Sequence, residues 1–254
     1  MYLPIKEQTV LVTGAGRGLG SEIARSFFKE GAKVIINYRN SYNQAKNLAD
    51  QLGDRAYIFQ GDIRCEKEVS KMYKNIYDQK LEVNTIVHNA IDDYVFNGEK
   101  RKKINEIDWL DFQKQIETSQ KGFLNLLKIF TPNMKKKNFG KIITIGTNLF
   151  QNPVVPYHDY TAAKGGLLSL TRTAAIDLGP FNINVNMISG GLLKITDASK
   201  ETPESVFDYI QNITPLRKVT TTEDFSDAVL FFASHWSRAV TGQNLIVDGG
   251  LVLN

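Results

Sequence analysis

The 254-residue chain contains a single cysteine, Cys65, and only three histidines. One cysteine excludes an intramolecular disulfide framework and any metal site built from several cysteines. We expect Cys65 to be a small, partly buried apolar residue. No run of about 18 apolar residues is present, which argues against a membrane-spanning helix. The first residues lack the apolar core of a signal peptide, so we expect a cytoplasmic protein.

The chain also lacks the strong charge imbalance that would indicate nucleic-acid binding. Thirty-one Lys and Arg residues against 27 Asp and Glu residues give a formal charge of only +4. Basic clusters at residues 100–103 and 135–137 could attract an acidic carrier protein, although we favour ordinary solvated charges at helix ends. No internal repeat and no linker rich in Pro, Gly or Ser is found. We therefore expect a single domain over residues 1–254.

Seven short runs rich in Val, Ile and Leu are expected to be strands. They are nearly continuous in apolar residues, which is typical of strands covered on both faces. The stretches between them have helical spacing, as in residues 19–30. This alternation predicts an α/β fold, a doubly wound, seven-stranded parallel sheet of the Rossmann type. The expected strands are residues 9–13, 33–38, 56–60, 85–88, 141–145, 183–188 and 244–247.

One long segment, residues 190–218, contains no strand-like run. It has a polar part, residues 196–203, and a short helical part, residues 204–210. It follows the sixth expected strand, at the sheet edge where ligands of such folds bind. Long excursions at that edge are more often functional than ornamental, so we interpret the segment as a substrate lid.

The first expected strand leads into the sequence TGAGRGLG, residues 13–20, and then into a helix. Glycines permit a tight turn and close approach of a phosphate, and the helix N-terminus offers N–H groups to a pyrophosphate. The alternative is a glycine-rich turn without a ligand. The loop residues predicted to bind the cofactor are Gly14, Gly16, Arg17, Gly18, Leu19 and Gly20.

The end of the second expected strand indicates which dinucleotide binds. NAD sites usually place an acidic residue there, but residues 37–41 contain no carboxylate. Arg39, together with Arg17, could hold a 2′-phosphate through paired hydrogen bonds. The alternative is that both arginines are merely solvated. We favour NADP(H) over NAD.

Tyr160 and Lys164 are four residues apart in a helical stretch, so they share a helix face. A free phenol has a pKa near 10 and transfers protons poorly at neutral pH, whereas a neighbouring ammonium favours the phenolate. Such a pair suits general acid–base catalysis. The spacing alone is common on ordinary helices, so the pair needs further support.

That support comes from several motifs in one order. After the glycine loop come Asp62, a His88-Asn89-Ala90 string and the Tyr160–Lys164 pair. Further motifs follow at residues 184–186, 241–243 and 248–250. Over essentially its whole length the chain resembles the short-chain dehydrogenase/reductase family, and within it the 3-oxoacyl-[acyl-carrier-protein] reductase type.

The resemblance implies roles for individual residues. Tyr160 is expected to be the catalytic acid–base, and Lys164 to bind the nicotinamide ribose and lower the pKa of Tyr160. Thr147 takes the place of the family's substrate-orienting serine, and Ser119 that of its helix asparagine, which supports a water-linked proton relay. The remaining cofactor-binding residues implied are Asn37, Arg39, Asp62, Ile63, Asn89, Ala90 and, through its backbone near the nicotinamide carboxamide, Leu193.

The sequence departs from the family pattern at four places. Ser119 replaces the asparagine, Ile91 replaces a glycine beside the cofactor, Gly190 replaces a proline, and Ile195 stands where threonine is common. A β-branched side chain at Ile91 disfavours positive φ and can crowd the cofactor. These departures argue against efficient catalysis and against the ordinary fatty-acid substrate, and they leave the predicted fold and cofactor almost unaffected.

The function predicted is an NADPH-dependent carbonyl reductase, with 3-oxoacyl thioesters, sugars, steroid-like compounds and small ketones open as substrates. The alternative is a dinucleotide-binding sensor or scaffold with little turnover. An acyl carrier protein is a candidate partner. The family resemblance implies a homotetramer or homodimer, paired through residues 106–133, 157–178 and 251–254. We interpret His88 as a hydrogen-bonded core residue and His158 as a rim residue.

Overall fold

The fold was obtained as a computed structural model, which describes residues 3–92, 94, 96, 101–194, 196 and 199–253. In this part of the chain seven parallel strands form a sheet in the order β3-β2-β1-β4-β5-β6-β7. This confirms the predicted doubly wound α/β fold. The strands are β1 (Thr9–Val12), β2 (Lys33–Tyr38), β3 (Ala56–Gln60), β4 (Thr85–His88), β5 (Gly140–Thr147), β6 (Ile183–Gly190) and β7 (Asn244–Val247).

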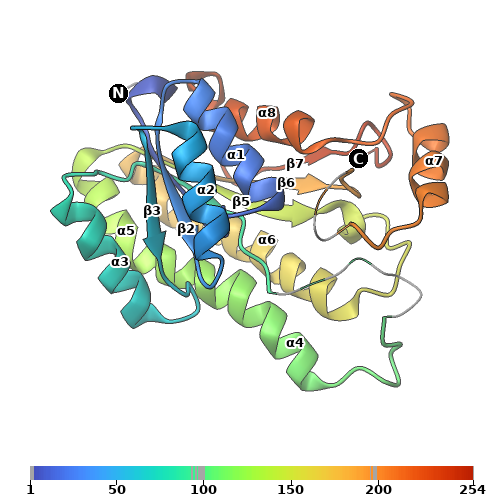
Figure 1. Ribbon diagram of the computed structural model, residues 1–254. Coiled ribbons are helices and arrows are strands. Elements are labelled where there is room, and N and C mark those ends of the chain that lie inside the picture. The colour runs from blue at the N-terminus through green and yellow to red at the C-terminus, as the bar shows by residue number, and fades with distance from the viewer. Residues whose placement is uncertain are drawn as a thin grey trace.

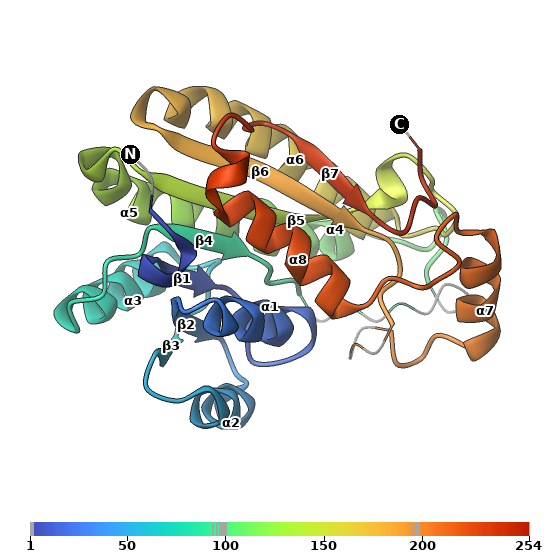
Figure 2. The ribbon, with the colours of Figure 1, turned by 90° about the horizontal axis from the view of Figure 1, so that it is seen from above.

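Helices cover both faces of the sheet (Figures 1 and 2). One face carries α1 (Gly18–Lys29), α2 (Tyr42–Leu52) and α8 (Thr222–Ala233). The other carries α3 (Glu66–Asp78), α4 (Trp109–Ile116), α5 (Gly122–Lys137) and α6 (His158–Leu178). The remaining long helix, α7 (Glu204–Ile213), belongs to the expected lid.

Each face of the sheet has its own hydrophobic core. Val10, Ile36 and Phe225 belong to the core beneath α1, α2 and α8. Leu11, Ile35 and Phe123 belong to the core beneath α3, α5 and α6. Successive strand residues point to opposite faces, so both sets must be apolar, and the strands lack a polar face for that reason.

The expected helix over residues 106–133 is divided. A capping box formed by Asp108 and Asp111 starts α4 at Trp109, because the two side chains and backbone N–H groups bond reciprocally. A π-helical turn, Glu117–Lys121, then joins α4 to α5, which continues to Lys137. Such turns are frequent at functional sites.

The carboxyl ends of β5, β6 and β7 face the side of the molecule that holds α7 and the beginning of α6 (the right of Figure 1). Thr147, the last residue of β5, pairs with Gly190, which in turn pairs with Val247 of β7. Gly190 is thus held in the sheet, and the lid starts from a fixed strand end. Among the described residues, no helix is long and apolar enough to span a membrane.

Candidate active site

The glycine loop between β1 and α1 has the shape that a pyrophosphate requires. Gly14 has φ +63°, and a Cβ there would lie 3.0 Å from the Ala90 backbone. A Cβ at Gly20 would lie 2.5 Å from Nδ2 of Asn89. Because α1 begins without a side-chain cap, the backbone N–H groups of its first turn can face an anion. The loop therefore fits the pyrophosphate of a dinucleotide.

Thr13, which the sequence reasoning missed, ties this loop to the end of β4. Its hydroxyl accepts hydrogen bonds from the N–H groups of Asn89 (3.1 Å) and Ala90 (3.0 Å). Nδ2 of Asn89 donates back to the Thr13 carbonyl oxygen at 3.0 Å. Asn89 thus positions the loop itself. The position of Thr13 directly before the glycine loop could have indicated this role from the sequence.

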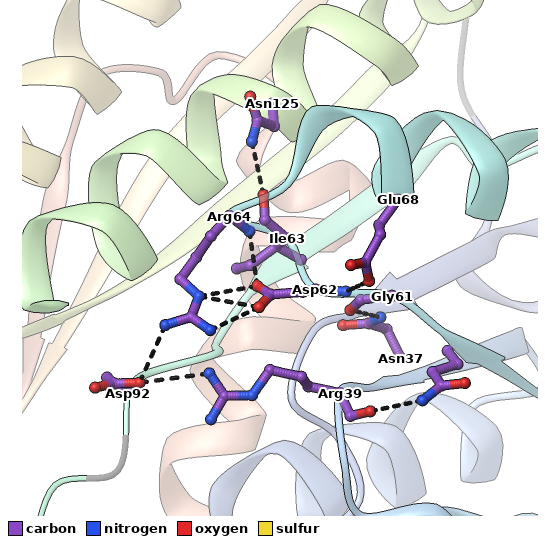
Figure 3. Close-up of polar contacts among 10 residues, drawn as sticks. Asn37, Arg39, Gly61, Asp62, Ile63, Arg64, Glu68, Asp92 and Asn125 are labelled. Carbon is purple, nitrogen blue, oxygen red and sulfur yellow. Dashed lines mark hydrogen bonds and ion pairs between the residues drawn. The ribbon is translucent and has the colours of Figure 1, made fainter.

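The carboxylate of Asp62 is held by a second missed residue, Arg64 (Figure 3). Nη2 of Arg64 donates to Oδ2 of Asp62 at 2.6 Å, and Nε contacts both oxygens at 3.0 and 3.1 Å. Burial acts to raise the pKa of Asp62, but the hydrogen bonds from Arg64 outweigh it and leave the pKa below its usual value. The group expected to meet the adenine is therefore an ionised, already paired carboxylate.

Asp92, which lies in the segment after β4, brings a carboxylate to the end of β2. Its Oδ1 lies 3.5 Å from Nη1 of Arg39 and 3.6 Å from Nη1 of Arg64 (Figure 3). Arg39 and Asp92 are 53 positions apart, so no local pattern could reveal the pair. Arg39, which was predicted to bind a 2′-phosphate together with Arg17, thus lies in a cluster of two arginines and two carboxylates.

Two of the expected cofactor residues, Asn37 and Ile63, have side chains committed to the interior of the protein. The side chain of Asn37 is buried, and its Nδ2 donates to the Gly61 carbonyl oxygen at 3.0 Å, tying β2 to the end of β3. The side-chain amide of Asn37 is therefore already hydrogen-bonded inside the sheet and does not point toward a cofactor site. Ile63 is a core residue whose carbonyl oxygen accepts a hydrogen bond from Asn125 at 2.8 Å.

The chemical end of the site joins β5 to α6. Tyr160 and Lys164 both lie on the buried face of α6, as their spacing predicted. Thr147, at the end of β5, is hydrogen-bonded to Tyr160. Nζ of Lys164 donates to the Ile145 carbonyl oxygen at 2.7 Å and lies 5.8 Å from the centroid of the Tyr160 ring.

Burial dominates the electrostatics of this pair. It raises the pKa of Tyr160 to about 12, while the hydrogen bond with Thr147 acts in the opposite direction. Burial also lowers the pKa of Lys164 to about 7. The pKa of Tyr160 is thus raised, whereas Lys164 was expected to lower it, because desolvation of the phenolate outweighs the hydrogen bond with Thr147.

Ser119 lies in the π-helical turn and is 1% exposed. Its carbonyl oxygen accepts a hydrogen bond from Nε2 of His88 at 2.9 Å. The His88 ring stacks on Phe123, and burial, with a contribution from the charge of Lys164, lowers the pKa of His88 to about 3. His88 is therefore a neutral core residue, as predicted.

Three further residues singled out in the sequence differ in exposure. Ile91 is 37% exposed, whereas Leu193 packs against the core beneath α1, α2 and α8. His158 lines a surface hollow, in agreement with a rim position. Ile195 and the last residue of the tail, Asn254, lie outside the described residues.

The basic clusters are largely compensated by nearby acids. Lys102 pairs with Asp111 at 2.6 Å, and Lys137 with Glu82 at 3.2 Å. Lys100 lies outside the described residues. The described lysines thus support the interpretation of ordinary surface charges over a docking patch.

Comparison with known proteins agrees with this geometry. Residues 14–252 match the family model described as "Enoyl-(Acyl carrier protein) reductase". The chain belongs to the short-chain dehydrogenase/reductase family. It is therefore an oxidoreductase that acts on CH–OH groups and the corresponding carbonyls.

Relatives within the short-chain dehydrogenase/reductase family differ in substrate. The chain is 32% identical to the 7alpha-hydroxysteroid dehydrogenase of Escherichia coli K12, covering 98% of this chain and 95% of that one. It is 28% identical to a 3-oxoacyl-[acyl-carrier-protein] reductase of Staphylococcus epidermidis, covering 97% and 99%. A gluconate 5-dehydrogenase from Burkholderia cenocepacia, solved with NADP and tartrate, superposes with a TM-score of 0.85 at 25% identity, covering 96% and 94%.

Proposed function

We propose that the protein is an NADPH-dependent carbonyl reductase in which Tyr160 is the proton donor. The observation that carries this proposal is the convergence of Tyr160, Thr147 and Lys164 at the end of the sheet that also carries the glycine loop. A 3-oxoacyl thioester remains one candidate substrate, with an acyl carrier protein as its partner. The lid formed by residues 190–218 is proposed to close over the substrate.

The residues present fit a dinucleotide. The loop from Gly14 to Gly20 would hold the pyrophosphate, and Asp62 with Ala90 would border the adenosine. Arg39 and Arg17 support NADP(H), because guanidinium groups bind phosphate through paired hydrogen bonds. The NADP found in the solved gluconate 5-dehydrogenase is consistent with this choice.

A bound nicotinamide supplies the hydride that the carbonyl carbon receives. The chain supplies the proton. Because the pKa of Tyr160 is about 12, its phenol keeps its proton at neutral pH and can give it to the carbonyl oxygen. The Thr147 hydroxyl donates a hydrogen bond to the same oxygen as charge develops there. The Lys164 ammonium lies close enough to stabilise the phenolate that remains.

The cofactor assignment is tested by fluorescence titration of NADPH and NADH. For Arg39→Ala we expect the Kd of NADPH to rise about tenfold, the size of a lost charged hydrogen bond, with little change for NADH. Arg25→Ala, on the same side of the fold but bonded to Gln51, is the matched control. If the Kd of NADPH and that of NADH rose equally in Arg39→Ala, a role of Arg39 in binding the 2′-phosphate would be refuted.

The proposed activity is tested by NADPH oxidation against a panel of ketones, keto acids and thioesters. Turnover of at least one carbonyl compound is expected. Tight NADPH binding without turnover on any of them would favour a dinucleotide sensor instead.

A further inference from the structure

The hydroxyl of Thr147 is oriented by the chain that follows it. Thr147 is the last residue of β5 and has an extended backbone, with φ −147° and ψ 147°. Its Oγ1 accepts a hydrogen bond from the Leu149 N–H at 3.3 Å and is also hydrogen-bonded to Tyr160. A hydroxyl has one proton and two acceptor lone pairs. Because the Leu149 N–H occupies a lone pair, its position decides in which direction Thr147 can donate.

Leu149 belongs to a short 3-10 turn, Asn148–Phe150. The Asn148 carbonyl oxygen closes the turn by accepting hydrogen bonds from the N–H groups of Gln151 (3.1 Å) and Asn152 (3.0 Å). Turns of this kind have poor hydrogen-bond geometry of their own, so their direction depends on what anchors them. Asn148 is the first residue of the turn and is 5% exposed. An anchor on its side chain therefore fixes the Leu149 N–H.

Asp248 provides that anchor from the other end of the chain. Nδ2 of Asn148 donates to Oδ2 of Asp248 at 2.9 Å, although the two residues are 100 positions apart. Asp248 directly follows β7, on the side of the sheet that carries α7 (Figure 1). Its carboxylate also accepts hydrogen bonds from the N–H groups of Gly250 and Val252, both at 3.1 Å. Hydrogen bonds to a carboxylate are stronger than neutral ones, so Asn148 is held firmly relative to β7.

Glycines allow this pair to be buried where β5, β6 and β7 end side by side. Gly191 directly follows β6, and a Cβ there would lie 3.0 Å from Nδ2 of Asn148 and 3.2 Å from Cβ of Asp248. Gly249 and Gly250 have φ +73° and +86°, so the chain turns back immediately after Asp248. The Asn148–Asp248 pair is thus enclosed by backbone and has little freedom to move.

We propose that Asn148 and Asp248 are positioning residues for the reduction. Asp248 holds Asn148, Asn148 fixes the turn, and the turn aims the Thr147 hydroxyl at the substrate oxygen. This rests on the proposed carbonyl reductase function. The hydrogen bond from Thr147 strengthens as negative charge develops on that oxygen. A misdirected hydroxyl therefore weakens the transition state more than the binding of substrate, and the loss appears in kcat.

The test is a double-mutant cycle on kcat, measured with NADPH and the carbonyl compound that the wild type reduces fastest. Asn148→Ala is expected to lower kcat about tenfold, the value of one lost hydrogen bond, with little change in KM or in the Kd of NADPH. In a Thr147→Val background, which already lacks the hydroxyl, the same substitution should lower kcat at most about twofold. Equal losses in the two backgrounds, or an unchanged kcat in Asn148→Ala alone, would overturn the proposal.

Two further variants separate positioning from stability. Asn186 of β6 is also buried, and its side-chain amide donates to the Val240 carbonyl oxygen at 2.9 Å and accepts from the Gln243 N–H at 3.0 Å. Asn186→Ala should lower the melting temperature and leave kcat unchanged, whereas a loss of kcat equal to that of Asn148→Ala would contradict the proposal. Asp248→Asn keeps the shape of the side chain and loses one accepting oxygen, so a smaller loss of kcat is expected. It replaces Asn148→Ala in the cycle if that variant does not fold.

Carbon-13 NMR of protein labelled at the tyrosine Cζ distinguishes this claim from the reductase function, because it needs no turnover. The Cζ signal of Tyr160, assigned by its loss in Tyr160→Phe, reports the hydrogen bond with Thr147. Thr147→Val and Asn148→Ala should move this signal in the same direction, and Asn186→Ala should leave it in place. That pattern without turnover of any carbonyl compound would support the positioning role and refute the reductase function. A signal that stays in place in Asn148→Ala would overturn the inference.

Discussion

Oδ1 of Asp92 lies 3.5 Å from Nη1 of Arg39, the guanidinium that we propose binds a 2′-phosphate. The Asp92 side chain is 15% exposed and that of Arg39 is 33% exposed. The contact is long and partly solvated, so it is a weak ion pair. A phosphate, which carries more charge, can displace the carboxylate at a modest cost.

Replacing Asp92 therefore tests this competition. For Asp92→Asn we expect NADPH to bind about two- to fivefold more tightly, because a weak ion pair no longer has to be broken. NADH affinity should stay the same. Fluorescence titration of both nucleotides measures the change, and weaker NADPH binding in the variant would show that Asp92 assists the cofactor.

The buried lysine gives a prediction about pH. Burial favours the neutral amine, so Lys164 should be protonated below pH 7 and largely neutral above it. Nitrogen-15 NMR of labelled lysine should show one Nζ that titrates near 7, assigned by its loss in Lys164→Met. Titration of that signal near the ordinary value of about 10.4 would mean that the site is far better solvated than described.

Nη2 of Arg101 donates to both carboxylate oxygens of Asp159 at 2.8 Å, and this pair is expected to stabilise the fold. Asp159→Asn leaves the guanidinium without its carboxylate in a nearly buried site, so the free energy of unfolding should fall by about 1–3 kcal/mol. Unfolding in urea measures this change in the free energy of unfolding. Glu66→Gln breaks the exposed pair with Lys128 and should cost less than about 1 kcal/mol. Equal effects of the two variants would contradict the assigned burial.

Self-association is the remaining prediction. Ile176 of α6 is 79% exposed and Leu124 of α5 is 47% exposed, and exposed apolar groups on adjacent helices are typical of interfaces. We expect a homotetramer or homodimer, which Ile176→Asp dissociates, as measured by sedimentation velocity. A wild-type monomer at micromolar concentration would refute it.

The strands and the catalytic helix could be predicted from sequence because their signals are local. Continuous apolar runs identified β1 to β7, and the four-residue spacing placed Tyr160 and Lys164 on one face of α6. The contacts of Asp92 with Arg39 and Arg64 could not be predicted, because Asp92 is far from both arginines in the sequence and meets them only once β4 is in the sheet. The pKa of Tyr160 was also missed, since desolvation depends on packing that spacing alone does not reveal.

The sharpest test of the account is the rate of NADPH oxidation by the wild type and by Tyr160→Phe, after confirming that both bind NADPH equally. The substrate is the compound of the carbonyl panel that the wild type reduces fastest. Loss of the proton donor should reduce kcat at least 100-fold, the usual contribution of general acid catalysis. A Tyr160→Phe variant that retains wild-type kcat would contradict the assignment of Tyr160 as the proton donor.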